Sequence, residues 1–257
     1  MATSAKSGRK VLAVPPLPVR PAFKRPFLDF ERGIRMGNLE PHERITQILK
    51  YELVRRHGQD FIIDKWGRGV YWQWICWIAR ADRDAKPLSS GYGFSCAKFF
   101  ISLDRDTRVL QAGMQIERAS LRPARGPVEG VHAAEDWDFY RFLKGLRKGS
   151  PLAKELDRLI CVEGFVANVG PFSQMTEFRG KAWGGPADAR RACRSIPDGD
   201  WGGVQLFYPV PEKELDAMDG SEIVATILAV FGEVTPMMNL VMQEPYLAEK
   251  GASPFSK

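Results

Sequence analysis

Acidic side chains with basic neighbours are the residues in this chain whose types suit a reaction. Metal-dependent nucleases hold Mg²⁺ with an Asp at a strand end and a second acid on the next strand, and a Lys helps to position water. Asp104 and Glu117 are candidates of this kind. They lie at opposite ends of one predicted strand, however, and at about 3.4 Å per residue they would be more than about 30 Å apart. Asp64 and Lys65 meet Glu117 only if the strands pair suitably, so a metal-dependent nuclease is an alternative and no catalytic residue is assigned.

The glycines, cysteines and histidines form no stronger motif. The stretches WGRGVYW and AWGGPADARRA lack the Lys-Ser or Lys-Thr ending of a phosphate-binding loop. The three histidines do not cluster with any cysteine, and no C-x-x-C pair is present. We therefore predict no metal site and no cofactor, and a reducing, cytoplasmic setting. The cysteines predicted to be unpaired are Cys76, Cys96, Cys161 and Cys193.

Aromatic residues are concentrated between residues 69 and 120. Most of them are expected to be buried in the core, because the faces of a sheet must be covered. Two or three rings near strand ends are also suited to a pocket that stacks on a base or another flat ligand. Tyr92 and Phe94 are the candidates for that role, since Gly91 and Gly93 leave the backbone around them open.

Basic residues dominate the N-terminus, and much of the formal net charge of +6 comes from there. Residues 1–26 contain no acid and several prolines, which disfavour helix and sheet pairing, so we predict a flexible, Pro-rich arm. Such an arm can contact nucleic acid or an acidic partner. The predicted contact residues are Lys6, Arg9, Lys10, Arg20, Lys24 and Arg25.

The fold prediction is built around residues 69–120. Alternating aromatic and β-branched residues predict three antiparallel strands in a meander, with a polar hairpin at residues 104–107. Apolar residues at helical spacing predict a helix over residues 41–57. The fold class is therefore α+β, with an antiparallel sheet flanked by helices.

The second half of the chain is expected to extend this domain. Strands are predicted near residues 161–168 and 203–209, and both are expected to join the same sheet. Pro236 is expected to separate a helix that ends near residue 231 from a short last helix. Residues 27–257 are thus one α+β domain, with a sub-boundary possible at the Pro- and Gly-rich stretch 121–134. No apolar run approaches the roughly 20 residues of a membrane helix, so no membrane contact is expected.

The expected function is that of a non-catalytic binding protein whose basic arm contacts nucleic acid or an acidic partner. A nuclease-like enzyme is one alternative, and an assembly subunit that contacts a neighbouring protein through the Pro-rich arm is another. The segment IARADRDAKPLSSGYGFSCAKFFISLDRD resembles small bacterial DNA-reading modules of restriction systems in the order of its elements. It covers less than a third of the chain and contains no diagnostic motif, so it assigns no family. The sequence indicates no oligomeric state.

Overall fold

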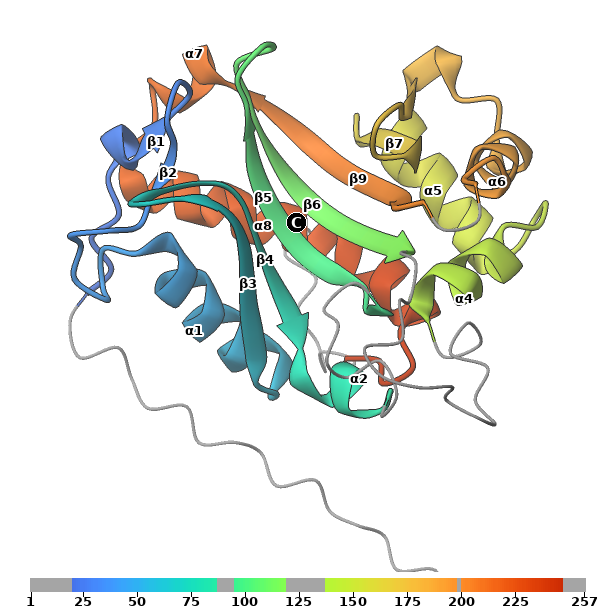
Figure 1. Ribbon diagram of the computed structural model, residues 1–257, viewed down its shortest axis with the longest axis horizontal. Helices are drawn as coiled ribbons and strands as arrows, with labels where there is room; N and C mark the ends of the chain where they lie inside the picture. The colour runs from blue at the N-terminus through green and yellow to red at the C-terminus, as the bar shows by residue number, and fades with distance from the viewer. Residues whose placement is uncertain (1–19, 87–94, 119–136, 198–199, 247–257) are drawn as a thin grey trace, which may run out of the picture.

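A computed structural model describes residues 20–86, 95–118, 137–197 and 200–246. Within these residues the chain forms one nine-stranded antiparallel sheet with helices around it (Figure 1), which confirms the predicted α+β class. The strands on the main path, in spatial order, are β1 (Leu28–Asp29), β2 (Gly33–Arg35), β4 (Tyr71–Ala79), β5 (Lys98–Asp104), β6 (Val109–Arg118), β9 (Gly202–Pro211), β7 (Val166–Pro171) and β8 (Thr176–Arg179). The remaining strand, β3 (Phe61–Arg68), pairs with β4.

The predicted meander is present. Strands β4, β5 and β6 pair in sequence order, and the β5–β6 connection turns directly after Asp104. Asp104 Oδ1 accepts hydrogen bonds from the backbone N–H groups of Asp106 and Thr107, both at 3.0 Å, so this carboxylate stabilises the turn. The later strands join the same sheet as predicted, with β9 inserted between β6 and β7.

The helices lie around this sheet. Those with a 3-10 conformation are η1 (Arg25–Phe27) and η3 (Gly180–Ala182). The α-helices of the described residues are α1 (Ile45–His57), α2 (Arg80–Asp84), α4 (Asp138–Gly145), α5 (Pro151–Cys161), α6 (Pro186–Arg194), α7 (Glu212–Leu215) and α8 (Gly220–Val241). Ser150 is the N-cap of α5, because its hydroxyl accepts from the backbone N–H of Ala153 at 3.0 Å. The helix runs on to Cys161, so the strand predicted from that residue begins only at Val166.

Helix α8 differs most from expectation. It runs unbroken for 22 residues through Pro236, where the sequence predicts a break. Asp219 and Glu222 form a capping box at its start, and the buried face packs on the sheet, so tertiary contacts outweigh the cost of the interior proline. The helix is also long and apolar enough to cross a membrane, although half of its most apolar window is buried inside the protein. That burial is typical of a core helix.

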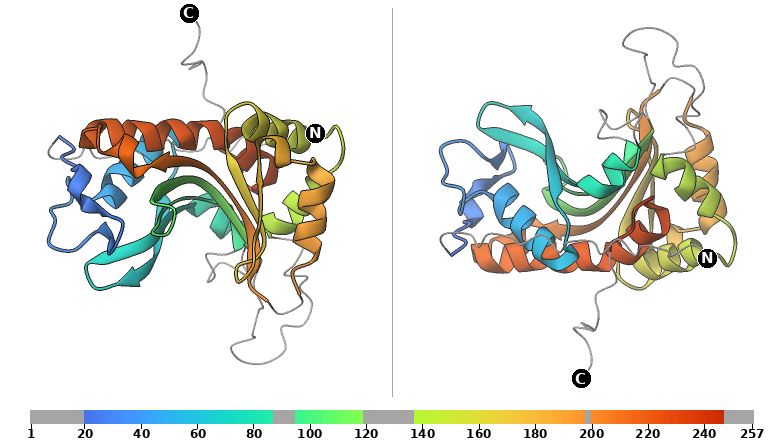
Figure 2. Two further views of the ribbon diagram at one scale, coloured as in Figure 1. Left: turned by 90° about the horizontal axis from the view of Figure 1, so that it is seen from above. Right: turned by 90° about the horizontal axis from the view of Figure 1, so that it is seen from below.

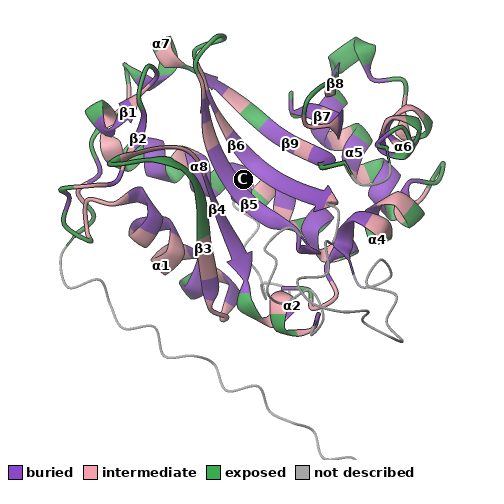
Figure 3. Ribbon diagram, viewed as in Figure 1, coloured by how far each residue is buried: buried purple, intermediate pink, exposed green. Residues whose placement is uncertain are grey.

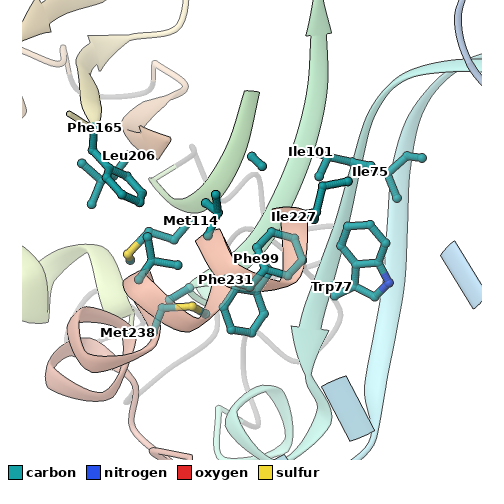
Figure 4. Packing of buried hydrophobic residues seen from close by; sticks show 14 of the residues in the cluster. Ile75, Trp77, Phe99, Ile101, Met114, Phe165, Leu206, Ile227, Phe231 and Met238 are labelled. Atoms are coloured by element: carbon teal, nitrogen blue, oxygen red, sulfur yellow. The ribbon is translucent and has the colours of Figure 1, made fainter. Parts of the chain in front are cut away.

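The core lies between α8 and one face of the sheet. Residues of β4 and β5 that alternate toward α8 are fully buried, among them Trp77 and Phe99. Phe231 of α8 stacks on Phe99 with ring centroids 4.7 Å apart (Figure 4). Trp77 also donates its indole N–H to the backbone oxygen of Thr46 in α1 at 3.1 Å, which joins that helix to the same core.

The opposite face of the sheet is concave, and part of it is covered by a smaller second core that contains Cys76, Phe100 and Phe207. Figure 2 shows that the sheet is strongly curved, with α8 along one side and with β3, β4 and the ends of β7 and β9 bending away from that helix. Twist and curvature of this degree bring strands from opposite ends of a sheet toward each other. Side chains on the hollow face therefore come from segments far apart in the sequence.

Candidate binding site

A hollow of about 650 Å³ lies on the curved face of the sheet that is turned away from α8. We call it the trough. Its floor comes from β4, β5, β6 and β9, and its two walls come from the end of β3 and from the segments that flank β7 and β9. Its lining residues are Asp64, Lys65, Trp66, Trp74, Lys98, Gln115, Glu117, Phe172, Trp201 and Gln205.

A buried ion pair forms one part of the floor. Lys98 and Glu117 are each only 2% exposed, and the Lys98 ammonium contacts Glu117 Oε1 directly. Burial is the largest single effect on the pKa of Lys98 and acts to lower it, but the charge of Glu117 and the hydrogen bond to it, with the effects of Cys76 and Cys96, together raise the pKa. The other carboxylate oxygen, Glu117 Oε2, accepts a hydrogen bond from the indole nitrogen of Trp201 at 2.6 Å. Both oxygens of Glu117 are therefore engaged.

Two glutamines form the adjoining part of the floor. Gln115 and Gln205 face each other across β6 and β9, and Gln205 Nε2 donates to Gln115 Oε1 at 2.9 Å. The same oxygen accepts from the indole nitrogen of Trp74 at 3.1 Å. Two donors on one amide oxygen fix the orientation of the Gln115 side chain. The floor is thus rigid and polar, in contrast to the apolar face under α8.

Two exposed tryptophans stand at the walls. Trp66 of β3 is 68% exposed and Trp201 is 56% exposed. Figure 3 shows that the outer half of β3 is exposed. Trp201 is braced by Phe172, whose ring lies edge-on at 5.3 Å and whose N–H donates to Trp201 O at 3.1 Å. Large aromatic rings left in solvent beside a hollow are typical of binding surfaces.

A β-bulge between β3 and β4 lies next to Trp66. The register between β3 and β4 shifts after Trp66, where Gly67 follows. A side chain at Gly67 would place its Cβ 2.5 Å from the Cα of Trp72, so only glycine fits this close approach. The extra residue of the bulge is Gln73 of β4, because Trp66 pairs with Trp74 and Gly67 pairs with Trp72. The close approach at Gly67 keeps the end of β3 against β4, and Trp66 lines the rim of the trough.

A second hollow of about 440 Å³ adjoins the trough and shares Trp66 with it. Three arginines line this hollow: Arg32, Arg68 and Arg105. The guanidinium of Arg32 stacks on Tyr71 at 4.0 Å, and Arg105 pairs with Glu31 at 2.8 Å. Arg68 has no ion-pair partner among the described residues. The hollow with the aromatic rings thus lies next to a hollow with guanidinium groups.

The carboxylates of the trough do not form a metal centre. Asp64 and Glu117 line the same hollow, as their possible cross-strand meeting suggested, but Lys98 and Trp201 already occupy both oxygens of Glu117. Asp104 serves the β5–β6 turn instead. Among the described residues, no group of three or more His, Cys, Asp or Glu side chains is placed to hold a metal ion.

The cysteines offer no reactive thiolate in the core. All four are unpaired, as predicted, and only Cys161 is exposed. Burial raises the pKa of Cys96 and of Cys193 to about 12 in each case. The pKa of Cys76, on the hollow face, is raised further by the same cause. Buried thiols of this kind stay protonated and inert.

A second buried group of charges is structural. Lys86 Nζ lies 2.7 Å from Asp82 Oδ1 and 3.1 Å from Asp138 Oδ1, and all three side chains are fully buried. Asp82 Oδ1 accepts from the backbone N–H of Gln243 at 2.8 Å, and Asp138 Oδ2 accepts from that of Ala97 at 2.6 Å. Burial and the neighbouring Asp82 raise the pKa of Asp138 well above its usual value. The cluster ties α2, α4, β5 and the C-terminal segment together.

Of the residues predicted for binding, Lys6, Arg9, Lys10, Tyr92 and Phe94 lie outside the described residues.

The other three predicted contact residues belong to the described chain. Arg20 is exposed, and Lys24 lies 3.8 Å from Glu43. Arg25 pairs with Asp216 at 2.8 Å and donates to the backbone oxygen of Leu28 at 2.6 Å, which leaves this guanidinium engaged within the folded body. None of the three lines the trough.

The trough was not predicted from the sequence, although β6 contains a signal for it. Leu110, Ala112, Met114 and Ile116 alternate with the residues of the hollow face, and all four are buried under α8 or its neighbours. The intervening positions are Gln111, Gly113, Gln115 and Glu117. Three polar residues among these alternating positions of a long central strand indicate that part of the second face of the sheet is polar.

Comparison with known proteins gives no further guide to the site. No family model matches the chain, and neither a curated protein nor a solved structure is significantly similar to it. The geometry of the trough is therefore the basis for a functional proposal.

Proposed function

We propose that the protein is a non-catalytic binding protein that takes unpaired nucleic acid into the trough. In this proposal the bases stack on the exposed tryptophans and the phosphates approach the arginines of the adjoining hollow. The observation that carries the proposal is the pair Trp66 and Trp201, both more than half exposed on opposite walls of a hollow with a polar floor.

Stacking supplies affinity in this arrangement. Each base that stacks on an aromatic side chain contributes about 1–3 kcal/mol, and every base has a face that can stack. Duplex bases are already stacked on one another and are not available to a side chain without being unpaired. Exposed rings beside a hollow of this size therefore favour single strands or extruded bases.

The charges favour the same ligand class. The ion pair of Lys98 and Glu117 has no net charge, so it gives the trough no strong attraction for anions. The adjoining hollow has three arginines against the single acid Glu31. Arginine contacts to phosphate give affinity that falls with salt. The basic N-terminal arm adds further phosphate contacts in this proposal.

A catalytic role has less support. A general base needs a free carboxylate or imidazole near the ligand, and both oxygens of Glu117 are occupied. The remaining carboxylate, Asp64, accepts from the backbone N–H of Lys65 at 2.8 Å and lies at the rim on an exposed strand end. Binding without chemistry is the simpler use of this arrangement.

Fluorescence titration of the wild-type protein and of Trp66→Ala and Trp201→Ala with labelled single-stranded DNA and RNA tests the proposal. Each substitution is expected to weaken binding about 5- to 150-fold, the range that corresponds to the loss of one stacked base. Val162→Ala is the matched control, because Val162 directly follows α5, is 75% exposed and lies outside the trough. Equal affinities for all four proteins would refute the proposal.

A further inference from the structure

We infer that the trough recognises the Watson–Crick edge of one unpaired base through the amides of Gln115 and Gln205. This inference rests on the proposed function and specifies the part of the nucleic acid that the floor contacts. It depends on the hydrogen bonds that the two amides make and on those that they leave unmade.

The orientation of both amides is determined by their partners. Gln115 Oε1 accepts hydrogen bonds from Trp74 and from Gln205. These two contacts identify the oxygen of the amide, so the Gln115 NH₂ group, Nε2, points away from both donors. Gln205 donates one N–H in this hydrogen bond, so its own carbonyl oxygen, Oε1, takes no part in it. In the described part of the chain neither Gln115 Nε2 nor Gln205 Oε1 has a hydrogen-bond partner. The pair therefore presents one donor group and one acceptor group to the trough.

The Gln115 Nε2 and Gln205 Oε1 groups lie on adjacent strands. Gln115 and Gln205 are direct cross-strand partners, and neighbouring strands are about 4.8 Å apart. The same row continues to Asn168 of β7, whose Oδ1 is buried without a partner among the described residues. Buried polar atoms are normally satisfied, and an unsatisfied one next to a hollow is an indication of a missing partner.

An unpaired base matches this pattern. Each of the four bases has at least one donor and one acceptor side by side on its Watson–Crick edge, and a duplex partner occupies that edge. A flat ring stacked on Trp66 or on Trp201 can direct this edge at the floor, where Gln115 donates and Gln205 accepts. Because all four bases offer such a pair, the recognition distinguishes unpaired from paired bases rather than one base from another.

A single-base probe tests the inference. The probe is a short oligonucleotide of abasic spacers with one central base, which is uridine in one version and 3-methyluridine in the other. The methyl group blocks the Watson–Crick donor but leaves the ring available for stacking. The wild-type protein is expected to bind the uridine probe about 10-fold more tightly, the change that corresponds to the loss of one satisfied hydrogen bond at a polar site.

Gln205→Ala serves as the matched variant. It removes the Gln205 carbonyl oxygen together with the Gln205–Gln115 hydrogen bond but keeps the Trp74–Gln115 hydrogen bond. It is expected to bind both probes with the affinity that the wild-type protein shows for the methylated one. Thermal melting checks that the variant is folded, and Gln111→Ala is the control for a polar residue of the same sheet that does not line the trough.

The outcomes separate the inference from the proposed function. Equal binding of both probes by the wild-type protein would overturn the edge recognition and leave the stacking role of the tryptophans in place. Retained discrimination in Gln205→Ala would likewise overturn it. Absence of binding to any oligonucleotide, including longer single strands with all bases present, would refute the proposed function itself.

Discussion

The indole nitrogen of Trp201 donates to Glu117 Oε2 at 2.6 Å, so a ring that is more than half exposed is fastened to a carboxylate that is 2% exposed. The other oxygen of Glu117 pairs with Lys98. The wall of the trough and its buried ion pair are therefore one connected unit. Substitutions that disrupt the Lys98–Glu117 ion pair should therefore also change the position of the Trp201 side chain.

Glu117→Gln is expected to destabilise the protein by about 3–5 kcal/mol, because it leaves the Lys98 ammonium buried without a counter-charge. Urea denaturation measures this loss. The double variant Lys98→Met/Glu117→Leu is expected to recover much of the stability, since two apolar groups leave no buried charge unpaired. Glu177→Gln on β8, whose carboxylate is 51% exposed, is the control and should change little. A Glu117→Gln protein as stable as the wild type would contradict the pairing.

His57 is expected to make stability depend on pH. Burial, with a smaller effect of Arg56, lowers the pKa of His57 from 6.5 to about 4. The unfolded chain then binds the proton more readily, so the free energy of unfolding falls as the pH drops from about 6.5 toward 4. The loss is at most about 3 kcal/mol. His57→Phe keeps the stacking on Tyr246, whose ring centroid is 4.2 Å away, and should show a flatter pH dependence. Parallel curves for both proteins would refute this.

Asp138 is expected to make stability depend on pH in the opposite sense to His57. Burial and the charge of Asp82 raise its pKa well above the usual value of 3.8, so the folded protein holds this proton more tightly than the unfolded chain. The stability linked to it is present at low pH and is lost as the pH rises from about 4 through the folded pKa. Asp138→Asn removes this titration and should gain stability relative to the wild type as the pH is raised. Urea melts at pH 5 and pH 8 measure the difference, and a constant difference would contradict the assignment.

Two truncations separate the arm from the folded body. Deletion of residues 2–19 removes Lys6, Arg9 and Lys10 and is expected to leave the melting temperature nearly unchanged. It should also reduce the dependence of nucleic-acid affinity on salt, by about 0.7–0.9 in the log–log slope for each phosphate that the arm neutralises.

Deletion of residues 2–26 should in addition lower the stability, by about 3 kcal/mol or more. It removes Phe23, which is 5% exposed, and the ion pairs of Arg25. Equal melting temperatures for the two truncated proteins would show that residues 20–26 do not contribute. Unchanged salt dependence after either deletion would remove the arm from the proposed interface.

The sheet was predictable from the sequence because its strands alternate. Trp77 and Phe99 stand among β-branched and aromatic residues, and this composition is typical of strands whatever their neighbours are. The outer half of β3 was not predicted, because Asp64–Arg68 has the polar composition of a turn and is held in the strand only by pairing with β4. Pro236 misled the prediction in the same way, since burial of α8 against the sheet outweighs the local preference.

The trough was beyond sequence reasoning for a different reason. Trp66, Glu117 and Trp201 are far apart in the chain, and only the curvature of the sheet places them around one hollow. The strand order matters as well, because β9 pairs with β6 ahead of β7. Local patterns indicate which residues face away from α8, but they do not state which strands become neighbours.

The position of β3 at one end of the sheet has a consequence for solubility. Among the described residues this strand pairs only with β4, so its other backbone edge is open to another chain. The outer half of the edge contains Asp64, Lys65 and Arg68, all exposed, and charged side chains of this kind oppose the addition of a further strand. Asp64 and Lys65, which also line the trough, therefore oppose edge-to-edge pairing between the sheets of two copies of the protein.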